Sequence, residues 1–293
     1  MELMTTYKQL VLGVLKISRD TALVVGEEGR QVVYDAGAEM YNPSSKADLA
    51  IAQNVLGYLM DNRVKAVFFD EELVKNHGGI KAHKNPEITI AFDDIDGTDN
   101  WRSARGLAPS TSIVAVFDSP REPRYSDLVA AGIVEINSGK LWYAESGKGV
   151  TLDGKHVKCS GRTDFSGKEP ARIGFDHYAL IGTNEHVDLN GLSRVAWVKD
   201  YATSGGHYAS LVGGKPDGTG SFDGWVNLRQ KEHELGAGYL FVKEGGGWIA
   251  ELDKDNPMAL DSSAYDFNGK RRIVAAGTEQ MGMAIINTLF NKK

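Results

Sequence analysis

An apolar run that ends in a cluster of aspartates, ITIAFDDIDGTDNW at residues 88–101, constrains this chain more than any other segment. Four acids occupy seven positions there: Asp93, Asp94, Asp96 and Asp99. Carboxylates at such close range repel one another, and some stay protonated unless a cation lies among them. The segment is therefore either a solvated turn, in which Asp and Gly are common, or a site for a divalent cation.

Length and composition indicate a globular protein with a core of useful size. The chain has 293 residues, 42% of them hydrophobic and 25% charged, with no repeat or low-complexity tract. We expect one compact unit made of two halves. Residues 1–160 would form an α+β half with the metal motifs, and residues 161–293 an α/β half with a third acidic motif and the substrate-recognition region.

The charge balance disfavours two classes of partner. A net charge of -6 argues against sequence-independent nucleic-acid binding, which needs a basic face, and against an anionic membrane surface. The apolar run LVLGVL is too short for a signal sequence, and no run approaches the roughly 18 residues that span a bilayer. The single cysteine, Cys159, excludes an intramolecular disulfide and fits a reducing compartment. We therefore predict a cytoplasmic protein.

Hydrophobic periodicity predicts both helices and strands, the mixture expected of a mixed α/β (α+β) fold. The predicted helices cover residues 7–17, 44–62, 205–212, 234–243 and 278–290. The predicted strands cover residues 64–69, 88–92, 111–117, 128–136, 140–145, 172–175 and 197–200. A hairpin is expected at 147–159 around Asp153-Gly154, and a loop at 213–224.

Two of these strands run directly into acids. Glu71 follows the strand at 64–69, and Asp93 and Asp96 follow the strand at 88–92. The ends of strands border ligand crevices in many sheets. A turn at this point could aim Asp93 and Asp96 inward with the Ile95 carbonyl between them. An all-oxygen set of this kind suits Mg²⁺ better than Zn²⁺.

Other polar residues are candidates for substrate contacts. The Thr98 hydroxyl and the backbone amides of Gly97 and Thr98 could face a phosphate group. Ser204 and His207 lie in the last third of the chain, and Arg229 could meet a second phosphate or a sugar hydroxyl, or simply end a strand in solvent. His207, like His233, could instead be a packing or surface histidine.

Three motifs in order resemble the inositol monophosphatase family, which belongs to the lithium-sensitive, Mg²⁺-dependent sugar phosphatase superfamily. FDDIDGTDN resembles that family's D-P-I-D-G-T signature, FFDEE its G-E-E, and HELGAGYLFVKEGGGWI at 233–249 its W-D-x-A-G-A-G and E-A-G-G stretch. The resemblance covers nearly the whole chain. It implies a layered αβαβα sandwich, a homodimer, and a small phosphorylated sugar or polyol as substrate. Inositol monophosphate is the first choice, fructose-1,6-bisphosphate the second and a 3'-phosphonucleotide the third.

The resemblance also implies roles for individual residues. Two or three Mg²⁺ ions, with Mn²⁺ as a substitute, would bind to Glu71, Asp93, the Ile95 carbonyl, Asp96 and Glu234. Asp93 would bridge two ions, and a third, weaker ion would lie near Glu71. Glu71 and Thr98 would position and deprotonate a water that attacks phosphorus directly, while Gly97 and Thr98 would bind the phosphate.

The chain departs from the family pattern at several of these positions. Glu234 stands where the family has Asp, with His233 in place of Trp, and Glu232 is the ligand if the alignment is shifted. Asp70 replaces a Gly and Asp94 a Pro. Their extra negative charge could tighten metal binding, but we expect both to face solvent, as we do for Asp99. These departures leave open a catalytically weak paralogue that only binds metal or phosphate. Trp101, Arg102 and Arg105 either form a lid or pack against the body of the protein.

Overall fold

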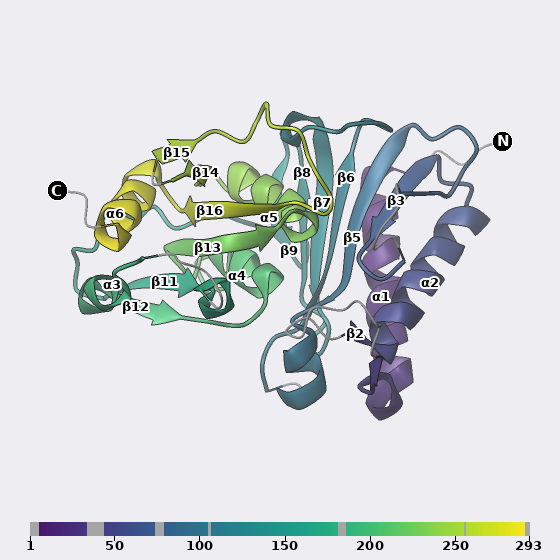
Figure 1. Cartoon of the computed structure of the whole chain (residues 1–293), viewed down its shortest axis with the longest axis horizontal. Helices are drawn as coiled ribbons and strands as arrows, with labels where there is room; N and C mark the ends of the chain where they lie inside the picture. Colours follow the sequence, from purple (N-terminus) through teal and green to yellow (C-terminus); the bar gives the residue numbers. More distant parts are fainter. Residues whose placement is uncertain are drawn as a thin grey trace.

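The computed structural model describes residues 6–33, 44–73, 79–104, 107–180, 186–254 and 256–290. Figure 1 shows five layers: a helix pair, an eight-stranded sheet, a second helix pair, a six-stranded sheet and a third helix pair. Three hydrophobic clusters fill the spaces between neighbouring layers. The predicted αβαβα sandwich is confirmed.

The first layer contains α1 (Tyr7–Gly29) and α2 (Lys46–Asp61), which cover the outer face of the eight-stranded sheet. A capping box between Thr6 and Gln9 starts α1, which continues twelve residues past the predicted end through a kink at Gly26. Ser45 caps α2, as expected from the sequence. Strands β1 (Val32–Val33) and β2 (Ser44–Ser45) pair beside these helices.

The eight-stranded sheet has the order β10-β9-β8-β7-β6-β5-β3-β4. Its strands are β3 (Ala66–Asp70), β4 (Ile80–Lys81), β5 (Ile88–Asp96), β6 (Thr111–Phe117), β7 (Leu128–Glu135), β8 (Leu141–Glu145), β9 (Gly149–Leu152) and β10 (Lys155–Val157). β3 and β5 are parallel, and the other neighbours are antiparallel. The carboxyl ends of β3 and β5 therefore meet at one edge of the sheet.

Strand β5 continues through the aspartates, whereas the sequence predicted that it ends before them. Asp93 pairs with Ile113 of β6 and Asp96 with Thr111, so one extra residue on β5 forms a bulge. Residues three apart in a regular strand point to opposite faces, but a bulge shifts this alternation by one. The bulge is what lets Asp93 and Asp96 face the same side.

The six-stranded sheet has the order β12-β11-β13-β16-β14-β15. Its strands are β11 (Ala171–Phe175), β12 (Ala196–Lys199), β13 (Gly224–Lys231), β14 (Trp248–Asp253), β15 (Asn256–Met258) and β16 (Lys270–Ala276). Helices α4 (Ser204–Leu211) and α5 (Glu232–Glu244) lie between the two sheets, while α3 (Leu189–Val195) and α6 (Glu279–Leu289) cover the outer face (Figure 1).

Short helical segments complete the described chain: η1 (Asn100–Ala104), η2 (Tyr125–Asp127) and η3 (His177–Leu180). Trp101 in η1 is buried and stacks under the Arg30 guanidinium, so it packs rather than covering a pocket; Arg105 lies outside the described residues. No helix among the described residues combines the length and the apolar character needed to cross a bilayer. The division into halves at residues 160 and 161 stays a prediction.

Candidate metal centre and active site

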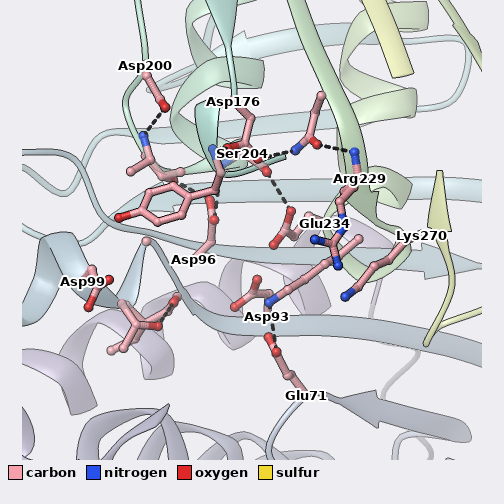
Figure 2. Close-up of a pocket in the computed structure, with 18 of the residues that line it drawn as sticks. Glu71, Asp93, Asp96, Asp99, Asp176, Asp200, Ser204, Arg229, Glu234 and Lys270 are labelled. Atoms are coloured by element: carbon pink, nitrogen blue, oxygen red, sulfur yellow. Dashed lines mark hydrogen bonds and ion pairs between the residues drawn. The ribbon is translucent and has the colours of Figure 1, made fainter. Parts of the chain in front are cut away.

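Four carboxylates meet at one end of a cavity of about 220 Å³ (Figure 2). We call Glu71, Asp93, Asp96 and Glu234 the acid cage. Their oxygens and one histidine nitrogen form two groups, Glu71–Asp93–His233 and Asp93–Asp96–Glu234, and within each group the three ligand atoms lie within 4.8 Å of one another. Asp93 belongs to both groups, so it is placed to bridge two cations.

Asp96 is held by the amino end of α4. Its carboxylate accepts hydrogen bonds from the Thr111 hydroxyl (2.9 Å), the Thr203 hydroxyl, and the backbone amides of Ser204 (3.2 Å) and Gly205 (2.6 Å). A Cβ on Gly205 would lie 2.3 Å from Thr111 Oγ1, so only glycine permits this approach. The contacts fix the orientation of Asp96 and link the first sheet to α4.

Glu234 lies in the first turn of α5 and completes the acid cage. Its Oε2 accepts hydrogen bonds from the Ser204 hydroxyl (2.6 Å) and the Gln230 side-chain amide. Burial, and then the charge of Asp96, raises the pKa of Glu234 to about 7. Glu232, the alternative ligand, points elsewhere: its carboxylate pairs with Arg271 Nε at 2.7 Å.

Two nitrogen-bearing side chains enter the acid cage: His233, which from the sequence could either approach the substrate or pack, and Lys231, which was not a candidate. Lys231 Nζ lies 3.0 Å from Glu71 Oε1, and His233 Nε2 lies 3.2 Å from Glu71 Oε2. Burial alone would raise the pKa of Glu71, but these two neighbours hold it well below its usual range. Burial raises the pKa of Asp93 well above its usual range, and the charges of Glu71, Asp96 and Glu234 add to this effect. Lys231 could have been noticed as a basic residue two positions before the third acidic motif.

The turn after β5 forms one wall of the cavity. Ile95, Gly97 and Thr98 all line it, and the Thr98 hydroxyl donates a hydrogen bond to the Ile95 carbonyl at 2.8 Å. Gly97 has a φ of +81°, and a Cβ there would lie 3.0 Å from Thr203 Cβ and 3.1 Å from the Ala202 carbonyl. The glycine is therefore required both by its backbone conformation and by the close approach of the chain before α4.

The opposite wall comes from the six-stranded sheet and carries both signs of charge (Figure 2). Arg229 and Lys270 line it together with Asp176 and Asn227. Asn227 Nδ2 donates to Asp176 Oδ2 at 2.9 Å, and the Asn227 side-chain oxygen accepts the Arg229 amide at 2.8 Å. Ser204 also lines the cavity, but its hydroxyl is engaged by the acid cage. Of these residues, only Arg229 and Ser204 were candidates from the sequence.

His207 does not reach the cavity, contrary to its predicted substrate contact. The side chain is fully buried and stacks on Trp225 with ring centroids 3.7 Å apart. Its Nδ1 lies 2.7 Å from the Thr203 carbonyl, and its Nε2 accepts the Tyr201 amide at 3.2 Å. Burial lowers the pKa of His207 to about 4. The residue packs the interior, and both of its nitrogens are engaged.

Asp70 and Asp94 are buried, which corrects the expectation that they face solvent. They are 0% and 2% exposed, and Asp94 lies near Asp70 and Asp48 of α2; none of the three belongs to the acid cage. Burial raises the pKa of Asp70 to about 7 and that of Asp48 to about 8. Asp99 is exposed, as expected, although it also lines the cavity outside the acid cage, and it pairs with Arg102 at 3.2 Å.

The donor atoms of the site fit a divalent cation. Each of the two groups offers at least two carboxylates, and oxygen donors suit Mg²⁺ and Mn²⁺. His233 Nε2 is buried and makes no hydrogen bond within the described part of the chain, although it lies 3.2 Å from Glu71 Oε2. A buried polar atom that makes no hydrogen bond and lies beside several acids is the arrangement expected of a metal ligand.

Comparisons with known proteins agree with this arrangement. No protein-family model matches the chain. The chain is 25% identical over 300 residues to a bifunctional NADP phosphatase/NAD kinase of Methanococcus maripaludis, an alignment covering 97% of the chain and 49% of the relative. It thus spans about half the length of that relative. It is 24% identical over 249 residues to an inositol-1-monophosphatase of Rhizobium meliloti, covering 83% of the chain and 84% of the relative.

Solved structures show the same fold. The extragenic suppressor protein SuhB from Bartonella henselae superposes with a TM-score of 0.74 at 19% identity, covering 96% of this chain and 97% of that one. An inositol monophosphatase-fructose 1,6 bisphosphatase has a TM-score of 0.74 at 18% identity, covering 97% of this chain and 100% of that one. The resemblance to the inositol monophosphatase family is confirmed in sequence and in fold.

Proposed function

We propose that this chain, as a member of the inositol monophosphatase family, is a cation-dependent phosphomonoesterase that hydrolyses a small phosphorylated sugar or polyol. The observation that supports this most directly is the pair of carboxylate groups that share Asp93 at the end of the cavity. Two cations sharing a ligand can act on both the attacking and the leaving oxygen of a phosphoryl group. Inositol monophosphate is the first substrate choice, followed by fructose-1,6-bisphosphate and a 3'-phosphonucleotide.

The cations in this proposal are two or three Mg²⁺ ions, for which Mn²⁺ can substitute. Glu71, Asp93, the Ile95 carbonyl, Asp96 and Glu234 would hold them. When bound, the cations supply the positive charge that phosphoryl transfer requires and that the acid cage lacks.

The residues of the chain would orient the reactants. Lys231 keeps Glu71 ionised, so that its carboxylate can accept a hydrogen bond from the attacking water and orient it. Thr98 would orient the same water, and the amides of Gly97 and Thr98 would bind phosphate oxygens. Direct attack by water leaves no covalent phosphoenzyme.

The opposite wall would bind the rest of the substrate. Arg229 and Lys270 offer positive charge across the cavity from the acid cage, where a second phosphate or a hydroxyl-rich body would lie. One relative is named as an NADP phosphatase, and it aligns with nearly the whole chain. NADP, through its 2'-phosphate, is therefore a fourth candidate substrate, larger than a simple polyol phosphate.

The test is phosphate release from inositol monophosphate, fructose-1,6-bisphosphate, a 3'-phosphonucleotide and NADP, with Mg²⁺, with Mn²⁺ and with EDTA. We expect cation-dependent turnover of at least one substrate. Absence of turnover from all four with either cation would contradict the proposal and favour a paralogue that only binds metal or phosphate. A homodimer, which light scattering would measure, and a cytoplasmic location are expected on the same grounds of resemblance and composition.

A further inference from the structure

His233 brings a nitrogen atom into the set of candidate metal ligands, whose other members are carboxylate oxygens. It lies in the first turn of α5, where its side chain is 7% exposed and its ring packs 5.2 Å from that of Phe267. Nε2 points at three carboxylates: it lies 3.2 Å from Glu71 Oε2, 3.7 Å from Asp93 Oδ2 and 3.9 Å from Glu234 Oε1. None of these contacts is a hydrogen bond within the described residues.

The distances suit a shared cation. Ligand atoms about 2.1 Å from one ion lie about 3.0 Å apart in octahedral geometry and about 3.4 Å apart in tetrahedral geometry. The observed separations of 3.2 and 3.7 Å between Nε2 and the oxygens of Glu71 and Asp93 are close to this range. The third separation, between the oxygens of Glu71 and Asp93, is within 4.8 Å, so the three atoms would have to move closer together to bind one ion.

Lys231 leaves this position open. Its ammonium group pairs with Oε1 of Glu71, whereas His233 faces Oε2 of the same carboxylate. The two oxygens therefore have different neighbours, and a cation between Oε2, Asp93 and Nε2 does not displace the Lys231 contact.

We propose that His233 Nε2 is a metal ligand, and that it makes the Glu71–Asp93–His233 pocket select a first-row transition ion such as Mn²⁺ over Mg²⁺. Imidazole suits transition ions, whereas Mg²⁺ prefers oxygen and keeps much of its water. The Asp93–Asp96–Glu234 pocket has oxygen ligands only and carries no such preference. The inference rests on the proposed cation site but concerns which cation it takes.

Pulsed electron paramagnetic resonance of the full chain loaded with Mn²⁺ tests the ligand directly. A coordinated imidazole gives a ¹⁴N coupling, and growth with ¹⁵N-histidine replaces it with a ¹⁵N coupling without any substitution in the chain. We expect this replacement. A spectrum with no histidine nitrogen coupling would overturn the proposal. His156→Gln is the control, because His156 is exposed and lies on β10, away from the acid cage. A coupling that disappears in this variant would also overturn the proposal.

Calorimetric titration tests the selectivity. In His233→Gln an amide oxygen replaces the nitrogen at similar reach, so the site becomes all-oxygen while its packing changes little. Loss of an outer hydrogen bond to a ligand costs about tenfold or more in metal affinity, and loss of the ligand nitrogen should cost at least as much. We expect the ratio of the Mn²⁺ and Mg²⁺ affinities to fall by about tenfold in His233→Gln and to stay unchanged in His156→Gln.

An unchanged ratio in folded His233→Gln would overturn the selectivity. Neither experiment requires turnover. If the protein shows the nitrogen coupling but hydrolyses no phosphate ester, the lack of hydrolysis contradicts the proposed function, while the coupling still supports His233 as a ligand.

Discussion

Replacing Asp93 with asparagine should separate the stability of the protein from its ability to bind cations. Asp93 is 3% exposed, and burial followed by the charges of Glu71, Asp96 and Glu234 raises its pKa well above the usual range. In the metal-free protein an ionised Asp93 therefore opposes folding. Asparagine keeps the shape and removes the charge, so we expect Asp93→Asn in EDTA to be at least as stable as the natural chain.

With metal present, Asp93→Asn should be less stable than the natural chain. A cation at a hundred times its Kd stabilises the folded state by about 2.7 kcal/mol. One kcal/mol raises the midpoint of thermal unfolding by about 2 °C in a protein larger than 150 residues, so the natural chain should gain about 5 °C. Asp93 belongs to both ligand groups, so Asp93→Asn should lose most of this gain.

Differential scanning calorimetry in EDTA and in saturating Mg²⁺ or Mn²⁺ measures both effects. Asp99→Asn is the matched control, because Asp99 lies in the same acidic segment but is exposed and outside the acid cage. It should keep the full metal-dependent rise. The reasoning is refuted if Asp93→Asn keeps the rise, or if Asp99→Asn loses it.

Three further predictions concern the neighbouring acids. Asp96→Asn should abolish phosphate release while the circular dichroism spectrum stays native, because the Asp93–Asp96–Glu234 group loses one of its three cation ligands. Undiminished turnover would contradict the metal assignment. Glu234→Asp should keep or raise activity at high Mg²⁺, and Glu234→Ala should lower the affinity for the cation measured by calorimetry. If only Glu232→Gln lowers that affinity, the shifted alignment is correct and Glu232 is the ligand. In EDTA the free energy of unfolding should fall between about pH 4 and pH 8. Asp70 and Glu234 have folded-state pKa values near 7, above their unfolded values, so ionising them in the folded protein costs free energy as the pH rises. Urea titrations across this range should show a flatter profile in Asp70→Asn, and an unchanged slope would argue against the burial of that charge.

Local patterns predicted much of the fold. The sequence located α2, α4, α5 and α6 to within a few residues. Burial follows one face in α2 and α6, whereas α4 and α5 are buried on nearly all sides between the two sheets. The polar second half of α1 was missed because its helical state depends on neighbours rather than on an apolar stripe. The extension of β5 through Asp96 was missed because a segment with three acids does not resemble a buried strand.

Some residues of the candidate site could likewise be predicted from local sequence, and others could not. Asp93, Asp96 and Glu234 could be proposed from spacing and from resemblance, and the structure brings them together with Glu71. The entry of Lys231 and the burial of Asp70 depend on strand pairing and on the packing of two sheets, which single-sequence patterns do not contain. His207 was misplaced because histidine suits both a ligand pocket and an aromatic stack.

The acid cage spans two layers of the sandwich. Asp93 and Asp96 come from the eight-stranded sheet, whereas Glu234 comes from α5, directly after a strand of the six-stranded sheet. A bound cation would thus act as a removable cross-link between the two sheets, and chelation would let them separate more easily. The amides of Ser204 and Gly205, which donate to Asp96, would report this as faster hydrogen exchange in the metal-free protein.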